Sequence, residues 1–175
     1  MSVDLTGLFA DRQASLPNEC DVSKALLGRL SRHFVIQKEA EGVHYSGKKV
    51  RIDAMLTPKE HLGWKHRCNI GLEIKRGSQG VGEITKQISQ AVDYANSYFP
   101  GFGYVYVFCF PDPEQSRWGE FRIFYDRLVG QLGVGFLAYT SDGLRLTLKG
   151  HLVWQESTGP YEARRWSMER KFGSK

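Results

Sequence analysis

Several signatures that assign chains to common classes are missing from these 175 residues. The cysteines, Cys20, Cys68 and Cys109, are odd in number and show no C-x-x-C spacing, which argues against a disulfide framework and a zinc site. The five histidines lack the H-x-x-x-H spacing of a zinc helix. There is no G-x-S-x-G motif, and the Gly-rich run 77–82 lacks the Lys-Ser/Thr pair of a Walker loop. Nucleophile-elbow hydrolases and ATPases are therefore not indicated.

Membrane and export signals are also missing. No apolar run approaches the roughly 18 residues that a membrane span needs. The N-terminus MSVDLTGLFADRQ lacks the basic start and apolar centre of a signal peptide. Together with the odd cysteine count, this predicts a cytoplasmic protein without a membrane partner.

Length and composition predict one globular domain. The chain is 41% hydrophobic and 13% aromatic, which favours a packed core over disorder. A net charge of +5 permits a polyanionic partner. We predict a single domain over residues 1–160, with its core at 19–110, and a basic tail over 161–175.

The periodicity of apolar residues predicts an α/β fold with a mixed β-sheet flanked by helices and a C-terminal β-hairpin or short meander. Val22, Leu26, Leu27 and Leu30 have helical spacing, and Asn18 or Asp21 is placed to cap that helix. The predicted strands are 33–42, 50–56, 69–77, 102–111 and those within 134–154. The predicted helices are one within 20–34 and those at 83–98 and 116–133. The strand–helix–strand unit over 70–110 implies a parallel crossover.

Two of these strands carry charged residues in a pattern that suggests chemistry. Alternation places Glu73 and Lys75 on one face of their strand, and Asp53 on the face shared with Arg51 and Met55. If the strands are neighbours, two carboxylates and one ammonium converge. A hard cation such as Mg²⁺ relieves the repulsion of two carboxylates. Two carboxylates with a bound metal and a neighbouring lysine are suited to metal-assisted hydrolysis of a phosphodiester. The simpler alternative for an E-x-K strand is a solvated ion pair of little consequence.

The order Asp53, then Glu73-Ile74-Lys75, then a helix with glutamines resembles the PD-(D/E)XK nuclease superfamily, which has the restriction-endonuclease-like fold. The resemblance covers roughly residues 19–110, although Ile52 stands where many members have proline. It implies that Asp53, Glu73 and the backbone carbonyl of Ile74 bind Mg²⁺ or Mn²⁺. It implies that Lys75 activates water or stabilises charge on phosphorus. It also implies a nuclease acting on DNA rather than RNA, and cleavage of both strands would favour a homodimer.

The resemblance points to further residues. In the family a helix amide, often with Tyr four residues later, lies near the metal; Gln90 with Tyr94 has that spacing, and Gln87 on the same flank is the alternative. Glu19 is the candidate for an additional acid. Glu39 is the alternative, although pairing around the turn at 45–46 is predicted to set it opposite Ile52 and away from Asp53.

Basic residues around the predicted site are candidates for contacts with phosphates. Lys65 and Arg76 are the two that we assign to substrate binding, because cations neutralise the nucleic-acid backbone. The alternative function is a non-catalytic module of the same fold that binds nucleic acid or protein.

Overall fold

The computed structural model describes residues 18–64, 68–75, 81–112 and 122–157. The predicted break of a helix near Gly119, the tail 161–175 and the side chains of Lys65 and Arg76 lie outside the described residues.

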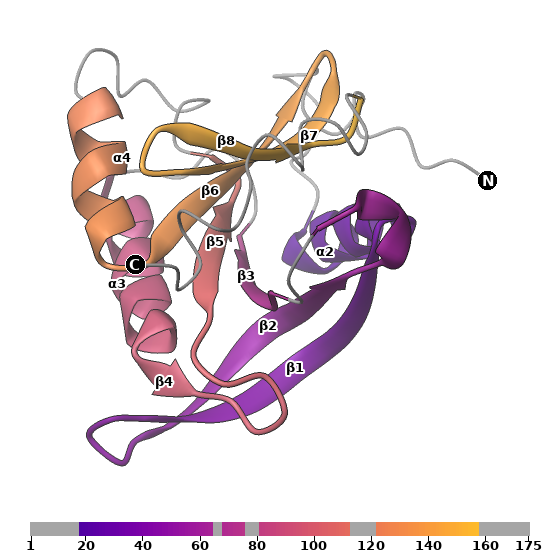
Figure 1. The fold of residues 1–175 in the computed structure, drawn as a ribbon. Coiled ribbons are helices and arrows are strands. Elements are labelled where there is room, and N and C mark those ends of the chain that lie inside the picture. Colours follow the sequence, from indigo (N-terminus) through magenta and orange to yellow (C-terminus); the bar gives the residue numbers. More distant parts are fainter. Residues whose placement is uncertain (1–17, 65–67, 76–80, 113–121, 158–175) are drawn as a thin grey trace.

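One mixed sheet of eight strands runs through the described residues, in the order β4-β1-β2-β3-β5-β6-β7-β8 (Figure 1). The central strands β3, β5 and β6 are parallel to one another, and every other neighbouring pair is antiparallel. The strands are β1 Phe34–His44, β2 Lys49–Pro58, β3 Ile70–Ile74, β4 Ser97–Tyr98, β5 Tyr106–Phe110, β6 Val134–Thr140, β7 Gly143–Leu148 and β8 His151–Gln155. The mixed α/β class and the parallel pairing of β3 with β5 are thus confirmed.

Helices cover both faces of the sheet (Figure 1). They are α2 Glu19–Leu30, α3 Val81–Ala95 and α4 Arg122–Gln131, with a short 3₁₀ helix η1 at Glu60–Leu62. Asn18 caps α2, since its side chain accepts a hydrogen bond from the backbone N–H of Asp21 at 2.9 Å. No helix in the described ranges is long and apolar enough to cross a membrane.

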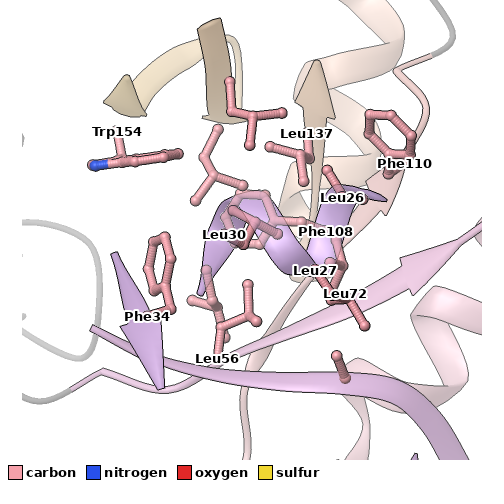
Figure 2. Close-up of a cluster of buried hydrophobic side chains, with 14 of the residues drawn as sticks. Leu26, Leu27, Leu30, Phe34, Leu56, Leu72, Phe108, Phe110, Leu137 and Trp154 are labelled. Atoms are coloured by element: carbon pink, nitrogen blue, oxygen red, sulfur yellow. The ribbon is translucent and has the colours of Figure 1, made fainter. Parts of the chain in front are cut away.

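Two apolar clusters, one on each face, hold the helices to the sheet. On the first face the predicted apolar stripe of α2 packs against the aromatic side chains Phe34, Phe108 and Trp154 (Figure 2). On the second face Ile84, Ile88 and Ala91 of α3 are buried, as their spacing predicts. Because both faces of the central strands are covered, those strands are apolar almost throughout.

Strand alternation is confirmed on β3 but is wrong on β2. Val50, Ile52 and Met55 belong to the cluster on the α3 face, whereas Ala54 and Leu56 belong to the cluster on the α2 face. The side on which successive side chains lie therefore reverses between Ile52 and Ala54, at Asp53.

The neighbouring strand shows the cause of this reversal. The register pairs Lys38 with Ala54 and Ala40 with Ile52, so Glu39 lies level with Asp53 and not, as predicted, opposite Ile52. Glu39 also has a φ of 50°, which side chains other than glycine seldom adopt. A left-handed residue turns the side chains after it to the opposite face of β1. The paired strand β2 shows the same change of face at Asp53, which lies level with Glu39.

The C-terminal strands β6, β7 and β8 form the predicted meander. Thr140 pairs with Gly143 across a two-residue turn at Ser141 and Asp142. Lys149 and Gly150, both with positive φ, make the second turn.

Close packing around β6 can be tested with a matched pair of glycine substitutions. In Gly135→Ala the new methyl group would meet the backbone oxygen of Thr147 and the ring of Phe108. We expect a loss of about 1–3 kcal/mol in the free energy of unfolding, measured by urea denaturation. In Gly28→Ala, on α2, nothing lies within 4 Å of the new methyl group, so we expect a gain of about 0.5–1 kcal/mol. Equal effects at both positions would contradict this packing.

Candidate active site

The site lies where the pairing of β2 with β3 ends. The ladder runs from Leu56 with Ile70 to Ala54 with Leu72, so Asp53 and Glu73 are the next residues on the two strands. There the Asp53 carboxylate replaces a backbone acceptor: its Oδ2 accepts a hydrogen bond from the N–H of Ile74 at 2.6 Å. Asp53 is thereby fixed beside the end of β3, and the predicted neighbourhood of the two acidic strands is confirmed.

Glu73 is the most buried charged side chain of the site, with 2% of its surface exposed. Its Oε1 lies 2.8 Å from Nζ of Lys75. Burial and then the charge of Asp53 raise the pKa of Glu73 to about 7, against the opposing effect of the Lys75 ammonium. Burial is the larger of the two causes, so the pKa is high mainly because the carboxylate is removed from water.

Lys75 keeps its proton in this setting. Burial alone would lower its pKa, but the hydrogen bond and charge of Glu73, with the charges of Glu19 and Asp53, outweigh burial and raise the pKa. Of the two roles that the family resemblance allows, a charged ammonium suits stabilisation of negative charge better than removal of a proton from water.

Glu19 reaches the same lysine from the first residue of α2. Its Oε1 lies 4.0 Å from Nζ of Lys75, and the side chain is half-exposed. Glu39, the alternative acid, instead pairs with Arg51 at 3.4 Å on the exposed surface. Of the two candidates, the structure brings Glu19 to the site.

Gln87 on α3 joins the ends of the two central strands. The side chain is 1% exposed, and Nε2 donates to the backbone oxygen of Phe110 at 3.0 Å and to that of Glu73 at 3.5 Å. The same Phe110 oxygen accepts a hydrogen bond from the N–H of Lys75 at 2.8 Å. Gln87 therefore helps to hold Glu73 and Lys75 at a fixed separation from β5.

Gln90, the preferred glutamine in the sequence analysis, is half-buried, and no hydrogen bond from its side chain to the site occurs in the described part of the chain. Tyr94 does lie within electrostatic reach. Burial, followed by the charges of Glu73 and Asp53, raises the pKa of its hydroxyl to about 12. Of the pair that the spacing suggested, Tyr94 is thus the residue that interacts with the charges of the site.

A signal in the sequence does single out Gln87. At about 100° per residue, Gln87 lies about 60° closer than Gln90 to the apolar stripe of Ile84, Ile88 and Ala91. Of two glutamines on one flank, the one nearer the apolar stripe is the more buried, and a buried amide must find a partner. Position on the helix was the better guide here than the spacing to Tyr94.

Cys109 is a neighbour that the sequence analysis did not place. It is the register partner of Glu73 on β5 and is fully buried, and burial raises the pKa of its thiol. A small apolar side chain beside Glu73 keeps water from that side of the carboxylate. Only the parallel register of β3 and β5, which the sequence does not specify, reveals the contact.

The oxygen atoms of the site fit a hard divalent cation. Asp53 and Glu73 supply carboxylates from adjacent strands, and Ile74 lies at the end of β3 with its N–H toward Asp53. In an extended strand the carbonyl of a residue points to the same side as its N–H. The described residues contain no cluster of three or more His, Cys, Asp or Glu side chains able to hold a metal. Mg²⁺ can bind through one or two carboxylates and keeps several waters, and Asp53 and Glu73 are two carboxylates on adjacent strands.

Comparisons with protein-family models, with curated proteins and with solved structures found no match. Support for a function therefore comes from the geometry of Asp53, Glu73, Lys75 and Gln87.

The raised pKa of Glu73 makes stability depend on pH in the metal-free protein. Between pH 4.5, the ordinary pKa of a glutamate, and about pH 7, Glu73 holds its proton in the folded protein but has lost it in the unfolded chain. The free energy of unfolding therefore falls as pH rises through this window. In Glu73→Gln we expect that fall to be reduced by on the order of 3 kcal/mol. The measurement is urea denaturation in EDTA across this pH range. Glu60→Gln, at an exposed carboxylate of η1, is the control and should follow the parent.

The role of Gln87 in joining the strands is tested by comparing two glutamines of one helix. Gln87→Ala should lower the free energy of unfolding by about 1–3 kcal/mol, because buried backbone oxygens lose a donor. Gln90→Ala should change it by no more than about 0.5 kcal/mol. Thermal or chemical denaturation gives both values, and a larger effect at Gln90 would contradict the assignment.

Proposed function

We propose that this protein hydrolyses phosphodiester bonds in DNA with Mg²⁺ or Mn²⁺, on a restriction-endonuclease-like fold. The observation that supports this most directly is the buried Glu73 carboxylate, held between the carboxylate of Asp53 and the ammonium of Lys75. Asp53 is a second acid, half-buried, whose charge adds to the cost of ionising Glu73. An uncompensated negative charge is expensive unless a cation completes the site.

Each residue of the site has a distinct role in the proposed reaction. Asp53 and Glu73 would hold the metal, together with the carbonyl of Ile74. When bound, a divalent metal lowers the pKa of its water and so supplies a nucleophile near neutral pH. Lys75 faces the reacting phosphate and offsets the negative charge that develops on it. Gln87 keeps the ends of β3 and β5 together, and thereby holds Glu73 and Lys75 in place relative to β5.

DNA is proposed as the substrate from the family resemblance. A net charge of +5 is compatible with a polyanion. The alternative is a module that binds nucleic acid or protein without cutting, and the same experiment distinguishes the two.

Hydrolysis is tested by incubating the purified protein with linear and circular DNA, single- and double-stranded, in Mg²⁺, Mn²⁺ or EDTA. We expect cleavage that requires the metal and falls at least about a hundredfold in Asp53→Asn, Glu73→Gln and Lys75→Met. Asp53→Asn is preferred to alanine, because the amide oxygen still accepts the hydrogen bond from the N–H of Ile74.

Two substitutions away from the site, matched to Lys75→Met and Glu73→Gln, serve as controls. Lys24→Met and Glu60→Gln change exposed side chains on α2 and η1 and should retain the activity of the parent. Calorimetry with Mg²⁺ should show binding that weakens in Asp53→Asn and Glu73→Gln but persists in Lys75→Met. A folded parent that binds nucleic acid but cuts none of these substrates would favour the binding module instead.

A further inference from the structure

The tip of the β1–β2 hairpin carries an exposed apolar surface that the proposed hydrolysis does not use. Four of the seven large hydrophobic side chains that are exposed in the described residues are Val43, Tyr45, Tyr98 and Tyr104, on the hairpin tip, β4 and the segment before β5. Val43 and Tyr98 are register partners, so their side chains share one face. The ring of Tyr104 meets that of Tyr98 edge-on, with centroids 5.8 Å apart. In Figure 1 β4 lies beside this end of the hairpin.

A groove of about 350 Å³ opens on the hairpin, with Pro100 on one side. Its charged lining consists of Glu41, Lys49 and Arg51. Arg51 is already paired with Glu39 at 3.4 Å. Glu41 and Lys49, by contrast, form no ion pair with any other residue in the described parts of the chain. The groove thus offers one unpaired acid and one unpaired base.

We propose that this surface, the hairpin face, defined by Glu41, Val43, Lys49, Tyr98 and Tyr104, is where two copies of the chain associate as a symmetric dimer. A nucleic acid would leave Glu41 against phosphates, whereas surfaces that bind nucleic acid are strongly positive. A second copy of the chain can pair with both charges, because Glu41 of each copy would meet Lys49 of the other. Tyrosine is also enriched at protein–protein interfaces, whereas isolated exposed apolar side chains have no such meaning.

The register of the hairpin makes the hairpin face complementary to itself. Glu41 pairs in register with Arg51 and Val43 with Lys49, so Glu41 and Lys49 are diagonal neighbours, about 7–8 Å apart. A two-fold axis through the groove brings Glu41 of one copy to the partner's Lys49, and repeats the contact in reverse. Val43 and the two tyrosines then lose contact with water on both sides of the axis. The inference does not depend on the proposed hydrolysis.

The test is a charge exchange between copies, followed by sedimentation velocity in EDTA over a wide range of protein concentration. The parent should show an equilibrium between monomer and dimer. Glu41→Lys and Lys49→Glu should each weaken the dimer by about tenfold, because both symmetric contacts turn from attraction to repulsion. An equimolar mixture of the two variants should associate more tightly than either alone, because only the mixed dimer places an ammonium opposite a carboxylate at both contacts. Tyr104→Ser should weaken the dimer without any change in charge.

Matched charge reversals away from the hairpin face serve as controls. Lys24→Glu on α2 and Glu60→Lys on η1 should leave the dimer of the parent unchanged, and circular dichroism checks that every variant is folded. A parent that stays monomeric at all concentrations would overturn the proposal, as would a dimer that neither reversal weakens or a mixture that gains nothing. If the parent is a monomer that binds single-stranded DNA, and Lys49→Glu abolishes that binding, the groove would be assigned to nucleic acid instead.

Discussion

The early end of the β2–β3 ladder is the constraint on which the site depends. Backbone N–H groups that leave a ladder inside a protein need another acceptor. At Ile74 that acceptor is the carboxylate of Asp53, at 2.6 Å. Because the bond forms at the point where the strands part, it fixes Asp53 next to Glu73. It thus serves the stability of the sheet and the geometry of the site together. A hydrophobic residue at position 53 would leave the Ile74 amide without this partner, whatever its effect on chemistry.

The rest of the sheet explains how Glu73 can be buried at all. β3 lies between β2 and β5, and apolar clusters cover both of its faces. A carboxylate in such surroundings is costly unless charged and hydrogen-bonded groups compensate for it. Lys75 supplies the charge, and the amide of Gln87 ties the backbone of Glu73 to that of Phe110. The buried helix face and the acidic strand end are therefore parts of one arrangement rather than separate features.

The sequence was sufficient for the main helices and strands and for the neighbourhood of the acids, but not for η1 or for β4, which the predicted helix 83–98 overran. Apolar spacing identified α2, α3 and the strands, since those patterns follow from which faces are buried. It could not reveal the reversal at Asp53, because a glutamate with positive φ has no sequence signature, and Glu39 was therefore set opposite the wrong residue. The preference for Gln90 followed a spacing known from the family. The structure instead brings the amide of Gln87, the alternative, to the backbone of Glu73 and Phe110, and Gln87 is the glutamine that lies nearer the apolar stripe of the helix.

The charges of the site also suggest why stability and function pull in different directions here. Without a cation, the Lys75 ammonium lies 2.8 Å from Glu73, and Glu19 adds a third acid to Asp53 and Glu73 at 4.0 Å from that ammonium. The protein could lower its free energy by replacing Glu73 with a neutral residue of similar shape, as many buried ionic groups can be replaced. Keeping an uncompensated acid in the interior is reasonable when binding of a cation returns that free energy to the folded state. The Asp53 carboxylate already has a structural role as the acceptor for the Ile74 N–H, and a bound cation would in addition offset the buried charge of Glu73.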